Sequence, residues 1–216
     1  MSAAEGRAVE TGHPAPSDRA ARQPDGETLR LVLLGAPGSG KGTQAVRLAE
    51  GTGARHISTG DLLRAEVAAG SALGHRVVGY LDAGELVPDD VLLELTLPLV
   101  ERAATQHGYV LDGFPRSVEQ ARELAARASD RAGVNRALFL SVPRDELVRR
   151  LLRRAAEQGR SDDTAKVIDR RLRVFDEETR PLLDHYRAAG LLATVDGNAE
   201  PDEVARRIRV ALDACR

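Results

Sequence analysis

An apolar run ends at a glycine-rich loop in the segment LRLVLLGAPGSGKGTQ, residues 29–44. Four residues separate Gly35 from Gly40, and Lys41 follows directly. The spacing G-x-x-x-x-G-K is typical of a phosphate-binding loop when a strand precedes it and a helix follows it. Glycines allow backbone N–H groups to converge on phosphate oxygens because no side chain stands in the way. The segment therefore predicts a strand, an anion-binding loop and a helix.

The position after Lys41 departs from the general motif, which has serine or threonine there. Gly42 occupies that place, and the hydroxyl comes one residue later as Thr43. We expect Lys41 to reach the β- and γ-phosphates of a nucleotide, with the helix N-terminus adding the positive end of its dipole. Switch GTPases, motor ATPases and small-molecule kinases all share such a loop. The loop by itself therefore predicts triphosphate binding, and the rest of the chain must show for what purpose.

Charge and cysteine content narrow the range of partners. The chain has 33 acidic and 31 basic residues in 216, for a net charge of −2, which argues against a nucleic-acid or membrane-surface partner. Cys215 is the single cysteine, so neither a disulfide nor a thiolate metal site forms within one chain. No apolar stretch has the length of a membrane span, and the N-terminus lacks the apolar core of a secretory signal. We expect a cytoplasmic protein.

From Leu29 onward, short apolar runs alternate with longer amphipathic segments. The strand-like runs are 29–34, 55–58, 108–111, 137–142 and 191–195. The helix-like segments are 41–50, 61–83, 89–106, 117–128, 144–157, 164–189 and 201–214. This alternation predicts an α/β fold, a five-stranded parallel sheet with helices on both faces, as in phosphate-loop NTPases. Residues 1–28 have no apolar period and are predicted to be a disordered extension, with a docking segment as the alternative.

A second anion site is indicated by the segment ISTGDLLR, residues 57–64. Asp61 lies at a predicted helix start, where an acidic residue also serves as an ordinary cap. Arg64 lies one turn after Gly60, where its guanidinium could reach an anion bound over the helix N-terminus. Capping alone leaves Arg64 without a role.

The segment DGFPRSVEQ, residues 112–120, follows another apolar run. Asp112 stands at the carboxyl end of that predicted strand, where phosphate-loop proteins place an acid that holds Mg²⁺, often through water. The turn Gly113-Phe114-Pro115 projects Arg116, which, taken in isolation, is better explained as an ordinary solvated loop residue.

Arginines gather in VRRLLRRAAEQGRSDD, residues 148–163. Arg150 and Arg154 are four residues apart, as are Arg149 and Arg153, so each pair shares one helix face. We expect one pair to face water and the other a site. Arg160 and Arg171 follow. A charged, solvated hairpin is the alternative, but two phosphorylated substrates facing one another would explain so many arginines.

Together these motifs resemble the adenylate kinases of the nucleoside monophosphate kinase family, in their short-lid form. GAPGSGKGTQ, STGDLLR, LDAGELVPD, LDGFPRS and the late arginine elements occur in the family's order. In that family the loop itself reads G-K-G-T, so Gly42 belongs to the subtype. The resemblance implies the reaction MgATP + AMP ⇌ 2 ADP, in adenine nucleotide homeostasis and salvage, with Mg²⁺ accompanying ATP and bound through Asp112.

The resemblance also implies roles for individual residues. The expected catalytic residues are Lys41, Arg116, Arg150, Arg160 and Arg171. ATP is expected to contact Gly38, Ser39, Gly40, Lys41, Gly42, Thr43, Arg154 and the backbone carbonyl of Ala199. AMP is expected to contact Thr59, Arg64, Glu85, Leu86, Val87, Gly113, Phe114, Pro115, Arg116, Gln120, Arg160 and Arg171. Among these, the Gln120 amide is expected to read the adenine edge, and residues 85–87 to act through their backbone.

Residues 29–216 are thus expected to form the kinase domain, with a monophosphate-binding insertion at 58–87 and a short lid at 154–164. Only five residues separate Arg154 from Arg160 and none is Cys or His, so no structural zinc is expected. A UMP/CMP kinase is the nearest rival, although relatives of the pyrimidine type tend to have alanine at Thr59. A nucleotide-binding switch is the rival of another class. We expect a monomer.

Overall fold

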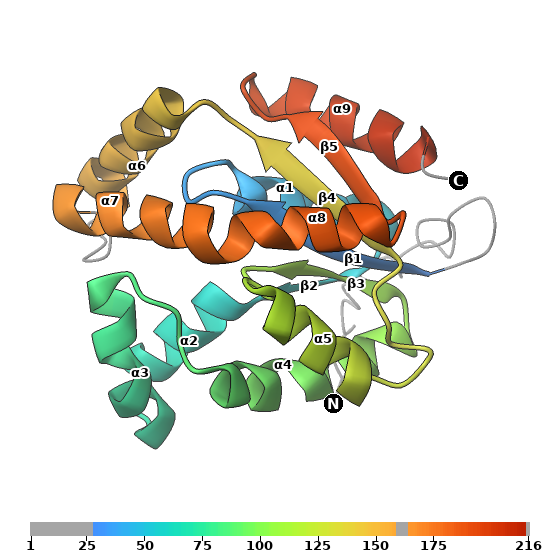
Figure 1. Ribbon diagram of the computed structural model, residues 1–216, viewed down its shortest axis with the longest axis horizontal. Helices are drawn as coiled ribbons and strands as arrows, with labels where there is room; N and C mark the ends of the chain where they lie inside the picture. The colour runs from blue at the N-terminus through green and yellow to red at the C-terminus, as the bar shows by residue number, and fades with distance from the viewer. Residues whose placement is uncertain (1–27, 159–163, 215–216) are drawn as a thin grey trace, which may run out of the picture.

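The computed structural model describes residues 28–158 and 164–214 (Figure 1). Within these residues, five strands form one parallel sheet in the order β2-β3-β1-β4-β5. The strands are β1 (Leu29–Gly35), β2 (Arg55–Ser58), β3 (Gly108–Asp112), β4 (Arg136–Ser141) and β5 (Leu192–Asp196). The predicted α/β fold with a five-stranded parallel sheet is confirmed.

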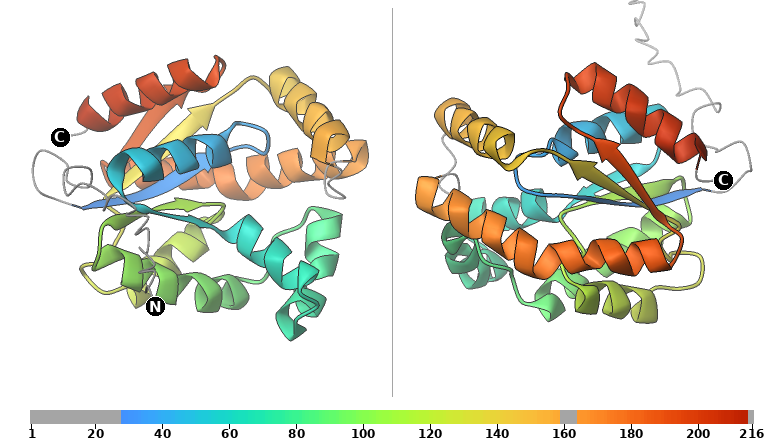
Figure 2. Two further views of the ribbon diagram at one scale, coloured as in Figure 1. Left: turned by 180° about the vertical axis from the view of Figure 1, so that it is seen from behind. Right: turned by 45° about the horizontal axis from the view of Figure 1, so that its top comes forward.

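Helices cover both faces of the sheet (Figures 1 and 2). They are α1 (Lys41–Thr52), α2 (Thr59–Ala68), α3 (Ala72–Ala83), α4 (Asp89–Ala104), α5 (Val118–Arg127), α6 (Arg144–Gln158), α7 (Ala165–Val174), α8 (Arg180–Ala188) and α9 (Pro201–Ala214). Alternate residues of β1 face opposite layers, because side chains along a strand alternate. Leu31 and Leu33 pack in one core with α1 and α9, whereas Val32 and Leu34 pack in another with α4, α5 and α8.

The helical segment predicted at 61–83 is two helices, α2 and α3, that pack against each other. The break lies at Gly70, whose φ of +61° is a conformation that favours glycine. Ser71 then caps α3, its hydroxyl accepting from the Gly74 N–H at 2.9 Å. A Cβ at Gly74 would lie 2.3 Å from the Glu66 carbonyl oxygen, so the close approach of the two helices requires glycine there.

The segment predicted at 164–189 is also interrupted. Between α7 and α8 lies a π-helical turn, η2 (Phe175–Thr179). Phe175 is buried there and stacks on Phe139 of β4, with ring centroids 6.4 Å apart. The hydrophobic period of the sequence does not reveal this turn, because the chain stays helical through it.

The strand order indicates a ligand site at the carboxyl ends of the strands. The central strand β1 pairs with β3 on one side and β4 on the other. After β1, the chain forms β2 and β3 on one side of it and then β4 and β5 on the other. Open α/β sheets bind ligands at such a point, in the crevice beyond the carboxyl ends. The phosphate loop leaves β1 here, and Asp112 ends β3 beside it, paired in register with Leu33.

Two predicted regions fall outside the described residues. The extension predicted at 1–28 does so except for Thr28, and so do residues 159–163 of the predicted lid, including Arg160. In the described part of the chain, no helix combines the length and the apolar character that crossing a bilayer requires.

Candidate active site

The phosphate loop is shaped by backbone conformation and by the helix packed beneath it. Gly40 precedes α1 with φ +91°, and a Cβ there would meet no atom within 4 Å, so the conformation alone favours glycine. At Gly38 (φ +83°) a Cβ would also lie 2.9 Å from the carbonyl oxygen of Leu147 in α6. The loop therefore lies directly on α6, with the N-terminus of α1 free to offer its N–H groups to an anion.

Lys41 lies over this loop. Its Nζ donates hydrogen bonds to the carbonyl oxygens of Gly35 at 2.7 Å and Ala36 at 3.1 Å. The pKa of Lys41 is lowered from 10.5 to about 8, chiefly by burial; Asp112 opposes this change, and Arg116, Arg171 and Arg154 contribute to it. Arginines from three separate elements thus act electrostatically on the loop lysine. Such a concentration of positive charge suits phosphate groups.

Asp112 provides the acidic group of the site. Its side chain is 12% exposed, and its Oδ2 lies 3.9 Å from His56 Nε2. The same oxygen would lie 3.6 Å from a Cβ at Gly42, so the carboxylate stands beside the first turn of α1, near the exposed Thr43. In the ranges 28–158 and 164–214, no three His, Cys, Asp or Glu side chains are grouped to hold a metal ion.

A pocket opens next to the loop, between α2, the end of α3 and the turn after β3. Its lining residues are Thr59, Gly60, Leu63, Arg64, Leu81, Gly84, Glu85, Leu86, Val87, Leu92, Gly113, Arg116 and Arg171. Segments far apart in the sequence, as well as the loop at 84–87, therefore meet around one hollow. Most of the residues expected to contact AMP lie in this lining.

Local hydrogen bonds position the polar side chains of this pocket. Thr59, which is 1% exposed, donates from Oγ1 to the Asp112 carbonyl oxygen at 3.4 Å. A Cβ at Gly113 (φ +86°) would lie 2.7 Å from that hydroxyl oxygen, so the turn admits only glycine. Arg116 donates from Nε to the Gly113 carbonyl at 2.7 Å. Arg64 pairs with Asp61 at 2.6 Å, with its guanidinium above Gly60.

Three described residues that are expected to contact AMP do not line this pocket. Phe114 and Pro115, which are joined by a cis peptide bond, are both buried, and neither lines the pocket. Gln120 is 0% exposed and lies beneath the Arg116 turn. Its Oε1 accepts from the Arg116 backbone N–H at 2.6 Å, and its Nε2 donates to Asp89 Oδ1 at 2.7 Å.

The two arginine pairs of α6 have different surroundings. Arg149 and Arg153 are 73% and 70% exposed. Arg150 is 20% exposed and donates to the Gly197 carbonyl oxygen at 3.3 Å, in the loop that leads to Ala199. Arg154 is half-buried and close enough to Lys41 to lower its pKa. The geometry thus favours Arg150 and Arg154 as the pair that faces the site.

The loop between β5 and α9 lies against the phosphate loop. A Cβ at Gly197 would lie 3.5 Å from the carbonyl oxygen of Ser39, a residue that is 2% exposed. Gln44 of α1 donates to the Pro201 carbonyl at 2.9 Å. Ala199, between these contacts, is therefore held close to the start of α1.

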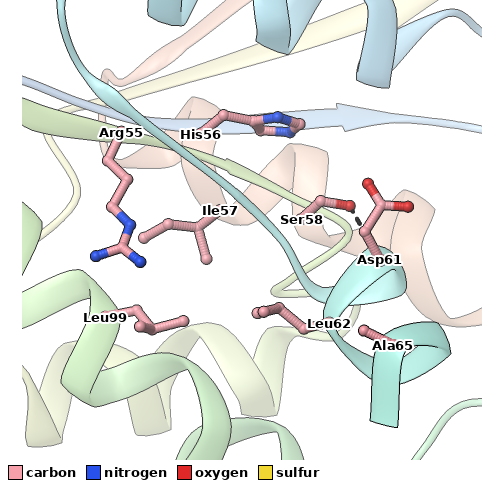
Figure 3. Close-up of a pocket in the computed structure, with 8 residues that line it drawn as sticks. All are labelled: Arg55, His56, Ile57, Ser58, Asp61, Leu62, Ala65 and Leu99. Atoms are coloured by element: carbon pink, nitrogen blue, oxygen red, sulfur yellow. Dashed lines mark hydrogen bonds between the residues drawn. The ribbon is translucent and has the colours of Figure 1, made fainter. Parts of the chain in front are cut away.

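A larger hollow of about 310 Å³ lies along the outer strand β2 (Figure 3). Figure 3 shows His56 and Ser58 on one side of the strand and Ile57, Leu62 and Leu99 on the other. Lys41 and the arginines around it do not contribute to its lining. We therefore assign the candidate active site to the phosphate loop and the pocket beside it.

Comparison with known proteins identifies the family of the chain. The family model described as "Adenylate kinase" matches residues 33–191. A protein named adenylate kinase from Stenotrophomonas maltophilia is 48% identical over 185 residues, which cover 85% of this chain and 99% of the relative. Those from Thermus thermophilus and Nocardia farcinica are 48% and 49% identical, covering 84% and 85% of this chain and 96% and 99% of theirs. This chain belongs to the adenylate kinase family.

Two contacts near the site have no signal in the sequence. Asp89, which bonds the Gln120 amide, stands in the first turn of α4 and resembles an ordinary acidic residue at a helix start. Arg170 of α7 pairs with Glu85 at 3.3 Å, joining segments 85 residues apart. No local pattern in the sequence indicates either contact.

Proposed function

We propose that the chain transfers the terminal phosphoryl group of MgATP to AMP at this site and forms two ADP. The observation that carries the proposal is the position of Arg116 and Arg171. Both line the pocket beside the phosphate loop, and both act on Lys41 strongly enough to lower its pKa. A protein that binds one nucleotide has no need of a second cationic pocket there. Membership of the adenylate kinase family supports the same conclusion.

On the donor side, the N–H groups of residues 38–43 would surround the ATP phosphates, with Lys41 contacting the β- and γ-phosphates. Arg154 would neutralise charge on the same phosphates. Arg150 and the carbonyl of Ala199 would bound the nucleotide from the other side, because Arg150 already contacts the loop that carries Ala199.

On the acceptor side, Arg64, Arg116 and Arg171 would hold the AMP phosphate, together with Arg160 from outside the described residues. Thr59 and the backbone of residues 85–87 would line the sugar and base. Gln120 would present the free hydrogen-bonding positions of its amide to the adenine edge. Gly113, which has no side chain and a φ of +86°, would allow AMP to approach the backbone of the turn closely.

The residues also fit a magnesium ion that arrives with ATP. The Asp112 carboxylate stands beside the first turn of α1, where it would accept hydrogen bonds from water bound to the ion. Mg²⁺ supplies charge neutralisation on the transferred group. The protein's own part is to hold donor and acceptor phosphates in line and to exclude water that would otherwise accept the phosphoryl group.

Exclusion of water requires parts of the chain to close over the substrates. We assign this movement to the insertion at 58–87 and to the short lid at 154–164. Opening of these segments after the reaction would then limit turnover. We further propose that the protein works as a cytoplasmic monomer, for which sedimentation of the purified chain tests the oligomeric part.

The decisive experiment measures ATP consumption with AMP, UMP, CMP, GMP or water as the acceptor. We expect AMP to be preferred by at least about tenfold in kcat/KM and to yield two ADP per ATP consumed. Preference for UMP or CMP would make the chain a pyrimidine nucleotide kinase. Hydrolysis that does not depend on AMP as the main activity would indicate a nucleotide switch instead.

A further inference from the structure

The buried amide of Gln120 is bonded at both of its ends. Its Oε1 accepts from the Arg116 backbone N–H at 2.6 Å, and its Nε2 donates to the Asp89 carboxylate at 2.7 Å. The Arg116 contact lies within the turn after β3, whereas the Asp89 contact crosses to α4, 31 residues away. The side chain that would read the base is therefore held by two different elements.

The two partners permit one orientation of the amide. A backbone N–H can only donate and a carboxylate can only accept. Rotating the amide by half a turn would place Nε2 against the Arg116 N–H and Oε1 against the Asp89 carboxylate. Both hydrogen bonds would be lost inside a buried site and replaced by two repulsive contacts. The amide therefore has a fixed direction.

A fixed direction has a chemical consequence for base recognition. After these two bonds, Gln120 retains one Nε2–H donor and one acceptor position on Oε1. The adenine edge offers an amino donor at position 6 and an acceptor at N1, a pattern that matches them. A 6-oxopurine such as that of inosine monophosphate presents the reverse, an acceptor at position 6 and a donor at N1. An amide able to rotate would serve both kinds of base.

We propose that Asp89 is a specificity-determining positioning residue, which fixes the Gln120 amide so that the acceptor pocket selects 6-aminopurine over 6-oxopurine monophosphates. The inference rests on the proposed function, since it concerns the acceptor of the same reaction. Asp89 acts through Gln120 and is assigned no contact with the base.

Asp90 provides a matched control for this role. Both acids lie in the first turn of α4, so both interact with the helix dipole in a similar way. Asp90 is exposed, whereas Asp89 is half-buried against Gln120. An effect caused only by negative charge at the helix start would appear in both variants.

The experiment measures kcat and KM for AMP and for IMP at saturating ATP, and KM for ATP at saturating AMP. Four variants are compared with the unaltered chain: Asp89→Ala, Asp89→Leu, Asp89→Asn and Asp90→Ala. Leucine has the branched shape of aspartate, with methyl groups in place of the carboxylate oxygens, so it separates loss of the hydrogen bond from loss of packing. Asparagine keeps one acceptor oxygen.

We expect Asp89→Ala and Asp89→Leu to raise KM for AMP and to lower the AMP-to-IMP ratio of kcat/KM, each about tenfold, the loss expected for one hydrogen bond. KM for ATP should stay within about twofold. Asp89→Asn should keep the ratio within about threefold, and Asp90→Ala should match the unaltered chain.

An unchanged AMP-to-IMP ratio in the alanine and leucine variants would overturn the proposal. So would an equal fall in Asp90→Ala, a parallel rise of KM for ATP, or unfolding of both Asp89→Ala and Asp89→Leu, because each would show a general structural role. Failure of the proposed function looks different. In that case the unaltered chain itself transfers no phosphoryl group to AMP.

Discussion

The two halves of the site are built in different ways. The donor half is a turn of backbone between a central strand and α1, and it rests on the buried core that Leu31, Leu33 and Ala45 share. The acceptor half is a cluster of side chains from α2, the loop at 84–87, the turn after β3 and α7. The difference indicates that the sheet core forms the donor half, whereas contacts between separate elements assemble the acceptor half.

The insertion at 58–87 is linked to α7 by contacts of Gly84 and Glu85, and this link illustrates the contrast. A Cβ at Gly84 would lie 2.8 Å from the side chain of Arg171, and Arg170 pairs with Glu85. These contacts join α3 to α7 at the surface. We therefore expect changes in the donor half to abolish the reaction or destabilise the fold, and changes at this link to alter AMP binding modestly.

The largest effect is expected at Lys41. Lys41→Met removes the cation over the phosphate loop and should lower kcat at least about 10³-fold, the scale seen when a group that stabilises transition-state charge is lost. The chain's other lysine, Lys166, is exposed on α7 and provides the matched control Lys166→Met. Steady-state assays of both variants decide the point, and activity in Lys41→Met equal to that of the control would contradict the assignment.

The same variant should gain stability at neutral pH. The pKa of Lys41 is about 8 in the folded chain and 10.5 ordinarily, so between these values the unfolded chain binds more protons and stability rises with pH. Below pH 8 the buried charge costs at most about 3 kcal/mol. Thermal denaturation at pH 7 should therefore show a higher Tm for Lys41→Met, and at pH 10.5 the gain should shrink.

A pH profile gives the next largest effect. If protonated Lys41 is required, kcat/KM for ATP should be constant below pH 8 and fall about tenfold per pH unit above it, because kcat/KM reports the free enzyme. Bound phosphates should stabilise the ammonium group and shift the fall in kcat to higher pH. A kcat/KM profile that stays flat to pH 10 would show that the charge of Lys41 is not needed.

Two glycines test how the donor half is shaped. Gly38→Ala places a Cβ against the Leu147 carbonyl at φ +83° and should reduce the free energy of unfolding by about 1–3 kcal/mol. Gly51→Ala, in α1, meets no atom within 4 Å and should be neutral or stabilising by about 0.5–1 kcal/mol. Urea denaturation compares them; equal losses would mean that α6 does not constrain the loop.

The smallest effect is expected at the link to the insertion. The Glu85 and Arg170 side chains are 47% and 44% exposed, so water screens their attraction. A double-mutant cycle with Glu85→Gln and Arg170→Gln should give a coupling below about 0.5 kcal/mol and change KM for AMP by less than about twofold. A large coupling that persists at high salt would show that this pair, rather than the pocket lining, holds the acceptor half together.

Most of the fold follows from local patterns in the sequence. Strand-length apolar runs, the glycine spacing of the loop and Asp112 after the third run are all local signals. Spacing alone does not distinguish the two arginine pairs of α6, and only the family resemblance favours Arg150 and Arg154. Exposure of Arg149 and Arg153 separates them, and exposure depends on which face of α6 packs against the site.

The remaining features depend on contacts between distant residues. Asp89 looks like any acid at a helix start until the fold brings it to Gln120. The break between α2 and α3 carries local signals in Gly70 and Ser71, yet the need for glycine at position 74 comes from packing on Glu66. Single-sequence patterns report which face is apolar but not which polar groups meet across elements.

The strand order also has a consequence for synthesis of the chain. β1 emerges early from the ribosome, yet its neighbours in the sheet, β3 and β4, follow dozens of residues later. Gly38 rests on the Leu147 carbonyl, which emerges later still. A nascent chain released before α6 would carry the complete phosphate-loop motif without the surface that shapes it. Nucleotide affinity should therefore arise late in translation, when a nascent chain can first be protected by its own substrate.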